Sequence, residues 1–197
     1  MSDRLVIVSS STSLPLSRLE AKAWLKIEEE ETADDAVIDQ LIATAWRRYE
    51  LLTQVAPMEQ TYDVYRDTAP CGALVVPRNP VASVVSIRTF SSTELTDTGG
   101  SVMAASDYYL DVASDLARVV PMGGATWPSG SRSINGFVAR IVAGHSAETT
   151  CVPDAIKTTL CRMVARAYEF RGDQSQAEQD ALMDEVVADE LAVQEWG

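Results

Sequence analysis

The sequence predicts an α+β protein: a small helical bundle with an inserted antiparallel β-rich region and an acidic helical tail at the C-terminus. Residues of about 17–52 and 153–171 carry apolar side chains at the three- and four-residue steps of amphipathic helices. The stretch between them is rich in Val, Tyr, Ser and Thr and is interrupted by Pro and Gly, which is typical of short strands joined by turns. The order helix, helix, strands, helix indicates a sheet inserted between segments of one helical core. We therefore expect a main domain over residues 1–172 and a separate acidic segment over residues 173–197.

Two helices are expected before the strand-rich region, over about residues 17–27 and 33–52. Ser17 and Glu20 match a capping box, in which the two side chains satisfy free backbone N–H groups of the first turn. Thr32 is the expected N-cap of the second helix. A row of basic residues at four-residue steps is interpreted as a solvent-exposed face, with an acidic neighbour as the alternative: Arg18, Lys22 and Lys26.

The β-rich insertion, about residues 60–143, is expected to contain short strands. The segments with strand composition are Thr61–Arg66, Ala73–Val76, Ser83–Phe90, Tyr108–Val112, Ala117–Val120 and Phe137–Val142. Two polar stretches that contain glycine pairs, residues 91–106 and 121–136, are expected to be long loops. Residues 9–13, SSSTS, are expected to be a polar lead-in to the first helix.

A third helix, over about residues 153–171, is expected to be the spine of the bundle. Pro153 suits the first turn, where its missing N–H would have had no partner, and Gly172 suits a left-handed cap after the last turn. One face carries apolar side chains at helical spacing: Ile156, Leu160, Met163, Val164, Ala167 and Phe170. This stripe is wide enough that the other helices must supply surfaces to cover it.

The C-terminal segment, residues 173–197, carries eight acidic residues and no Lys or Arg. Repulsion between these acids weakens an isolated helix. Its apolar residues have partly helical spacing, and two interpretations stay open: the segment packs on the bundle, or it becomes ordered by docking on a partner. For the second interpretation the candidate interface residues are Leu182, Val186, Val187, Leu191, Val193 and Trp196, with Trp196 as the anchor.

The composition argues against several classes of function. The net charge is −13 and the pI is about 4.4, and no cluster of basic residues that could hold nucleic-acid phosphates is present. The cysteines Cys71, Cys151 and Cys161 lack CxxC spacing and are expected to be reduced and mostly buried. The apolar run Leu5–Val8 is too short for a signal peptide, and no stretch reaches the ~18 apolar residues of a membrane span.

No constellation of residues indicates catalysis. His145 is the one histidine, it is not accompanied by a GxSxG nucleophile motif, and we expect it in a turn after a strand. The pairs Gly99–Gly100 and Gly123–Gly124 do not lead into phosphate-binding motifs, and the acidic stretches lack the spacing of a calcium loop. We therefore predict that the protein is not an enzyme and has no catalytic, metal-binding or cofactor-binding residues.

Over about residues 14–171 the sequence resembles the head–tail connector (adaptor, or head completion) proteins of long-tailed bacteriophages and gene transfer agents. The resemblance depends on the order and spacing of many short pieces, whereas the acidic segment lies beyond it. In chain order the matching residues are Leu16–Ser17, Glu20–Lys22, Leu25–Ile27, Asp34–Asp35, Leu41–Ala43, Ala45, Tyr49–Glu50, Thr53, Gln60–Thr61, Leu74–Val81, Val84, Ile87, Asp107–Leu110, Trp127–Pro128, Val142–Gly144, Val152–Pro153, Ile156–Lys157 and Tyr168–Arg171.

The resemblance implies a structural virion protein made in the host cytoplasm and located in the virion neck. Such adaptors form a ring, usually of twelve copies, between the portal protein and a stopper or tail-completion protein. Packaged DNA passes through the ring without specific binding, and neither a cofactor nor a membrane is involved. An excess of negative charge suits a channel wall past which DNA must slide. The alternatives are a stopper or tail-terminator neck protein, a DNA-packaging accessory protein, and a small enzyme.

Overall fold

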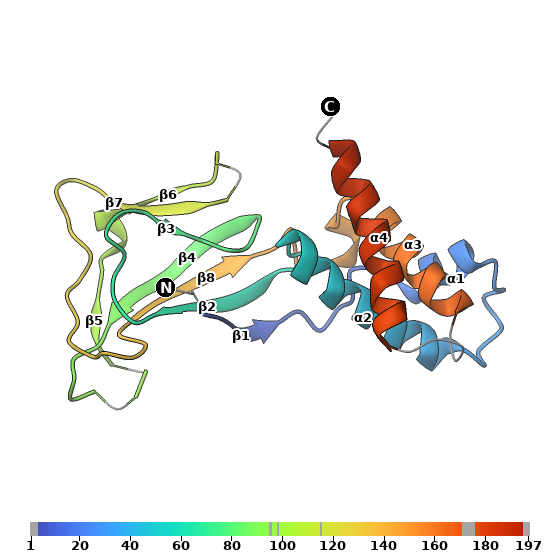
Figure 1. Cartoon of the computed structure of the whole chain (residues 1–197), viewed down its shortest axis with the longest axis horizontal. Helices are drawn as coiled ribbons and strands as arrows, with labels where there is room; N and C mark the ends of the chain where they lie inside the picture. Colours follow the sequence, from blue (N-terminus) through green and yellow to red (C-terminus); the bar gives the residue numbers. More distant parts are fainter. Residues whose placement is uncertain (1–3, 95, 98, 115, 171–175, 195–197) are drawn as a thin grey trace. The chain divides into compact units, whose positions relative to one another are not determined.

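The computed structural model describes residues 4–94, 96–97, 99–114, 116–170 and 176–194, and it divides the chain into two compact units. Residues 1–11 and 59–145 form the β unit, which carries the described strands, and residues 12–58 and 146–197 form the helical unit, which carries the described α-helices (Figure 1). The predicted α+β class, with a β-rich insertion between segments of a helical bundle and an acidic helix at the end, is therefore confirmed.

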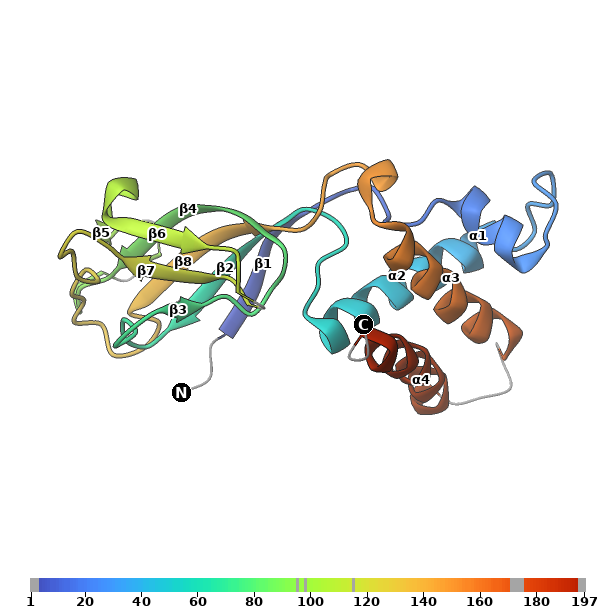
Figure 2. The same ribbon diagram turned by 90° about the horizontal axis from the view of Figure 1, so that it is seen from above.

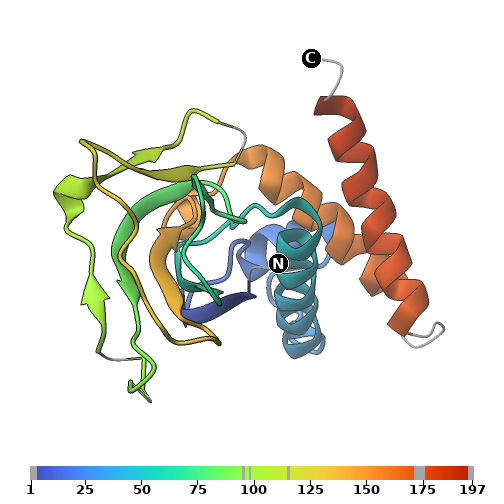
Figure 3. The ribbon, with the colours of Figure 1, turned by 60° about the vertical axis from the view of Figure 1, so that its left-hand side comes forward.

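The β unit consists of two antiparallel sheets. The larger sheet has five strands in the order β1 (Arg4–Ser10), β2 (Gln60–Arg66), β8 (Phe137–Ala143), β4 (Val81–Thr89) and β5 (Ser101–Val102). The smaller sheet has the order β3 (Leu74–Val75), β7 (Arg118–Pro121) and β6 (Tyr108–Asp111). The larger sheet is visibly curved, and the smaller one lies across one of its faces (Figure 3).

The core of the β unit lies where the two sheets meet. Along β8, Phe137, Ala139 and Ile141 are buried in this core, whereas Arg140 points to the opposite face. Both sheets contribute buried side chains to one cluster: Tyr62, Val64, Leu74, Val76, Val81, Ile87, Met103, Ala117, Val119, Phe137, Ala139, Ile141 and Ala143. The interdigitation of two inner sheet faces is the packing expected of a β-sandwich.

The helical unit is built from α1 (Arg18–Leu25), α2 (Asp35–Thr53), α3 (Asp154–Glu169) and α4 (Gln176–Gln194). The helices α2, α3 and α4 contact one another, and α1 packs on α2 and α3 (Figure 2). The predicted capping box is present, because Glu20 N donates to Ser17 Oγ at 3.2 Å and Ser17 N donates to Glu20 Oε2 at 2.8 Å. Five of the six residues of the predicted stripe belong to the core, and Leu160 and Met163 are fully buried. The sixth, Phe170, follows the end of α3 and lies outside this core.

Several elements differ from the sequence-based expectations. The strand β1 covers the apolar run Leu5–Val8 and the first part of the expected polar lead-in, and it is an edge strand paired with β2. The short strand β5 lies within the expected loop 91–106. The expected N-cap Thr32 lies outside α2, which begins at Asp35 after Asp34. None of the described helices is long and apolar enough to span a membrane.

Candidate interaction surfaces

The described residues include one histidine and three cysteines, side chains often found at catalytic or metal sites. No group of three or more His, Cys, Asp or Glu side chains among them is placed to hold a metal ion. His145 is exposed and follows the end of β8 by two residues, as predicted. The expectation of mostly buried thiols is wrong, because Cys71 and Cys151 are exposed and only Cys161 is buried.

The apolar side of α4 belongs to the helical core. Met183, Val186 and Val187 are at most 4 % exposed and pack in the same cluster as the buried residues of α2 and α3. Two of the candidate interface residues, Val186 and Val187, are therefore buried in the helical core. The side chains of the other four, Leu182, Leu191, Val193 and Trp196, lie outside the described residues. The interface assignment stays a prediction.

An arginine of α2 forms ion pairs with two aspartates of α4. Arg48 Nε donates to Asp184 Oδ1 at 2.6 Å and Arg48 Nη2 donates to Asp184 Oδ2 at 2.5 Å, a two-pronged pair that sequence spacing does not reveal. Arg48 Nη1 also lies 3.7 Å from Asp180 Oδ2. These carboxylates raise the pKa of the Arg48 guanidinium, chiefly through the hydrogen bonds to Asp184.

The packing of α4 changes how its function can be tested. A deletion of residues 178–197 would test a docking tail only if this segment could be removed without harm to the fold. In the structure this deletion would expose core that Met183, Val186 and Val187 cover. Substitutions on the exposed side of α4 are needed instead, where Glu178, Ala181, Glu185 and Ala188 lie.

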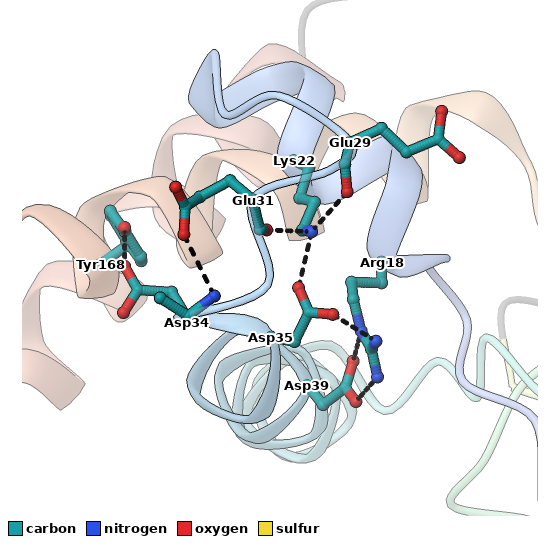
Figure 4. Close-up of polar contacts among 9 residues, drawn as sticks. Arg18, Lys22, Glu29, Glu31, Asp34, Asp35, Asp39 and Tyr168 are labelled. Atoms are coloured by element: carbon teal, nitrogen blue, oxygen red, sulfur yellow. Dashed lines mark hydrogen bonds and ion pairs between the residues drawn. The ribbon is translucent and has the colours of Figure 1, made fainter.

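The loop between α1 and α2 is held from inside by a buried lysine (Figure 4). Lys22 is 3 % exposed, and its Nζ donates to the backbone oxygens of Glu29 at 3.1 Å and Glu31 at 2.5 Å. The same Nζ lies 2.6 Å from Asp35 Oδ1. The interpretation of Lys22 as part of a solvent-exposed row is therefore wrong, and the alternative of an acidic neighbour holds. Four consecutive exposed acids, Glu28 to Glu31, remain on the outside of this loop.

Further ion pairs join the same loop and α2 to their neighbours. Arg18 Nη1 donates to Asp35 Oδ2 at 2.7 Å, and its Nε donates to Asp39 Oδ1 at 2.9 Å. Tyr168 of α3 donates its hydroxyl to Asp34 (Figure 4). The hydrogen bond from Lys22, aided by the charge of Arg18, holds the pKa of the Asp35 carboxyl below its usual range.

The two long loops of the β unit lie against each other. Ser92 N donates to Ser131 Oγ at 2.9 Å, and Arg132 Nη2 lies 2.8 Å from Asp97 Oδ1. Glu94 accepts backbone N–H groups of Ser91 at 2.6 Å and of Gly100 at 2.7 Å, which lowers the pKa of its carboxyl. The loops surround a polar hollow of about 600 Å³, lined by Thr89, Ser91, Glu94, Gly100, Ser101, Ser129, Gly130 and Ser131.

Two further hollows contain aromatic side chains. In the helical unit a groove of about 320 Å³ is lined by Trp24, Arg162, Ala165, Arg166, Glu169, Glu185 and Val186. In the β unit a hollow of about 510 Å³ is lined by Pro70, Cys71, Gly72, Ala73, Val120, Pro121, Ala125, Thr126 and Trp127. The first mixes two arginines with two glutamates, whereas the second has no charged lining residue.

Comparison with known proteins identifies the fold. No protein-family model matches the sequence, and comparison with curated proteins finds no match. Among solved structures, a chain in the neck of an empty gene transfer agent (GTA) particle computed with C6 symmetry is similar, with a TM-score of 0.73, 19 % identity and coverage of 93 % of this chain and 94 % of that chain. A chain in the virion of a native GTA particle has a TM-score of 0.73, 20 % identity and coverage of 92 % and 93 %. A chain in the neck of a native GTA particle computed with C12 symmetry has a TM-score of 0.65, 20 % identity and coverage of 94 % of both chains.

Proposed function

We propose that this protein is a structural component of a virion neck, in a long-tailed phage or a gene transfer agent. The observation that carries the proposal is that the likeness to the neck chains extends over 93 % of this chain and 94 % of the neck chain, so it includes both units. Fold alone does not define function, but a likeness that extends over almost the whole length and includes both units narrows the choice of function more than a match to one common fold does.

Within this class, we propose the particular role of head–tail adaptor. The protein would form a ring, with twelve copies as the expected number, between the portal and a stopper or tail-completion protein. This choice rests on the ordered sequence resemblance to adaptors, and the C12 symmetry used for the neck of the native GTA particle is compatible with it. A stopper or tail-terminator is the alternative within the same class.

The charge of the protein fits passage of DNA through such a ring. With a net charge of −13 and an exposed acidic loop at Glu28 to Glu31, the surface repels phosphates instead of binding them. A DNA-packaging accessory that grips DNA would need the opposite charge. A small enzyme is the less favoured alternative, because the likeness over almost the whole chain is to chains of virion particles.

For the contact with the portal, we propose the exposed side of α4 together with Trp196. Because Val186 and Val187 are turned into the core, a partner would meet the side that carries Glu178 and Glu185. The partner surface would then be basic. We propose Trp196 as the anchor of this contact, since aromatic residues often dominate the binding energy of interfaces.

Electron microscopy of purified portal mixed with this protein tests the proposal. We expect added ring density beneath the portal. The double variant Glu178→Lys/Glu185→Lys and the variant Trp196→Ala should each reduce portal occupancy. The matched control is Glu28→Lys/Glu30→Lys, which makes the same change of charge on exposed residues of the same unit.

Each outcome of this experiment has a definite meaning. Absence of added density would contradict the adaptor role, and density only when a tail component is present would favour the stopper. If the control lowers occupancy as much as the α4 variant, net charge and not α4 governs attachment. If Trp196→Ala decorates portals at wild-type occupancy, Trp196 is not the anchor.

A further inference from the structure

The outer face of the three-stranded sheet is unusually apolar for an exposed surface. Along β3, β7 and β6 the side chains alternate, so Leu74 and Val119 enter the core while their neighbours point outward. Val75 is 41 % exposed, Val120 is 38 % exposed and Tyr109 is 60 % exposed. Val120 also lines the 510 Å³ hollow that contains Cys71 and Trp127. We call the three outward residues and this hollow the outer apolar face.

The walls of the hollow are held in place by the fold. Trp127 Nε1 donates to the backbone oxygen of Gly72 at 2.8 Å, which joins its two sides. The Trp127 ring also stands edge-on to the buried Phe137, with 5.5 Å between the centroids. A surface whose aromatic side chain is already ordered loses little entropy when a partner covers it.

Charge near the outer apolar face is neutralised within the protein. Arg118 shares the outward side of β7, and its Nη2 and Nε donate to Asp111 Oδ2 at 2.6 and 3.1 Å. Asp111 also accepts the backbone N–H of Ala113 at 3.0 Å, and these bonds, that of Arg118 first, lower the pKa of its carboxyl. The hollow itself has no charged lining residue.

This lack of charge bears on which partner fits. Two copies that each carry a net charge of −13 repel one another in most orientations. The repulsion is weakest where the two surfaces that meet carry no unpaired carboxylate. A strongly basic partner, by contrast, would gain nothing from an uncharged face. Aromatic residues within an apolar, ordered surface are also typical of the centre of interfaces.

We propose that the outer apolar face is a contact surface for a second copy of this chain. The inference rests on the proposed ring, in which every copy must contact its neighbours. Because ring contacts are heterologous, the outer apolar face of one copy meets a different surface of the next. An added carboxylate at this face would then lose its hydration in the contact without gaining a partner.

The cysteines provide a probe in the unaltered protein. Cys71 is exposed in the hollow, Cys151 is exposed in the helical unit, and burial raises the pKa of the Cys161 thiol to about 11, which keeps it slow to react. Maleimide labelling is followed peptide by peptide by mass spectrometry, first for dilute protein at low salt and then for the ring on the portal. We expect labelling of Cys71 to slow several-fold in the ring while labelling of Cys151 serves as the internal reference.

Matched variants test whether the outer apolar face, and not another exposed surface of the same unit, forms the contact. Tyr109→Asp should prevent neighbouring copies from completing the ring, whereas Ile134→Asp, at a residue that is 69 % exposed in the same unit, should not. Circular dichroism and thermal unfolding of both variants verify folding. If Tyr109→Asp does not fold, the proposal is tested by the labelling of Cys71 in the wild-type ring.

The possible failures are distinguishable. If rings form on portals but Cys71 is labelled at its dilute rate, or Tyr109→Asp assembles like wild type, the outer apolar face is not the contact and the adaptor role stands. If portals carry no ring, the proposed function itself fails. Protection of Cys71 that appears only after a stopper or tail component is added would assign the face to that component and overturn the proposal.

Discussion

The two units use charged residues in different ways. In the β unit the described ion pairs join neighbouring strands or loops of a structure whose core is formed by two sheets, as with Arg140 of β8, which is 42 % exposed and pairs with the buried Asp63 of β2. In the helical unit, charged side chains hold whole elements in place: buried Lys22 fixes the loop before α2, and Arg48 fixes α4. The strands of a sheet are joined by backbone hydrogen bonds, so ion pairs are not needed to hold them together. Helices share no backbone hydrogen bonds with one another and are held together by side-chain contacts.

The largest expected effect is the loss of apolar packing in the helical core. Leu160→Ala should destabilise the helical unit by about 2–5 kcal/mol, because the side chain is fully buried between the helices. Hydrogen exchange followed by residue gives the stability of each unit separately. Ile141→Ala is the matched change in the β unit, where the side chain is also fully buried.

If the two units are independent, each substitution should lower protection only in its own unit. Loss of protection in both units after either change would show that they unfold together. A thermal midpoint of Leu160→Ala equal to that of wild type would contradict the assignment of this residue to the core.

The next effect concerns the buried lysine. Lys22→Met should cost about 3 kcal/mol, since it removes a buried ammonium that donates to the backbone oxygens of Glu29 and Glu31 and pairs with Asp35. Amides of residues 28–34 should exchange faster. Lys26→Met, on an exposed lysine of the same row, should change stability little. Equal effects of the two substitutions would mean that burial of Lys22 does not matter.

A smaller effect is expected at the α4 contact. Arg48→Ala should cost about 1 kcal/mol, because the partners Asp184 and Asp180 are 38 % and 33 % exposed and water screens the pair. Amide exchange in α4 should rise, and more so at low salt. Arg18→Ala is the comparison, since it removes pairs between α1 and α2 and should leave exchange in α4 unchanged.

Acid should weaken both units, because each contains a carboxyl group whose pKa is lowered in the folded state. The lowered pKa values of Asp35 and Asp111 mean that their stabilisation is fully present above about pH 4 and is lost as the pH falls through the folded-state pKa. Chemical denaturation between pH 2 and 6 should therefore show a smaller acid-dependent loss for Asp35→Asn than for wild type. An identical pH profile would show that Asp35 is not stabilised by its neighbours.

Local signals in the sequence determined much of the secondary structure. The capping box at Ser17 and Glu20, the apolar stripe around Leu160 and the alternation in Phe137–Val142 each depend on residues within a few positions of one another. Such patterns restrict the backbone whatever the rest of the chain does. The charge of the surface and the absence of a catalytic motif also follow from the residues alone.

Tertiary structure alone decided where these elements meet and which charges are buried. The strand β1 forms because β2 offers it partners that are 50 or more positions away, and its polar half carries no strand pattern of its own. Lys22 has the spacing of an exposed row, yet the loop before α2 folds over it. The acidic helix α4 is held by Arg48 and by three apolar side chains that enter the core of other helices. For β1 and α4 the stabilising partner is distant in sequence, and for Lys22 it lies beyond the helix that carries the lysine. The spacing of residues within one helix or strand contains no information about a partner outside that element.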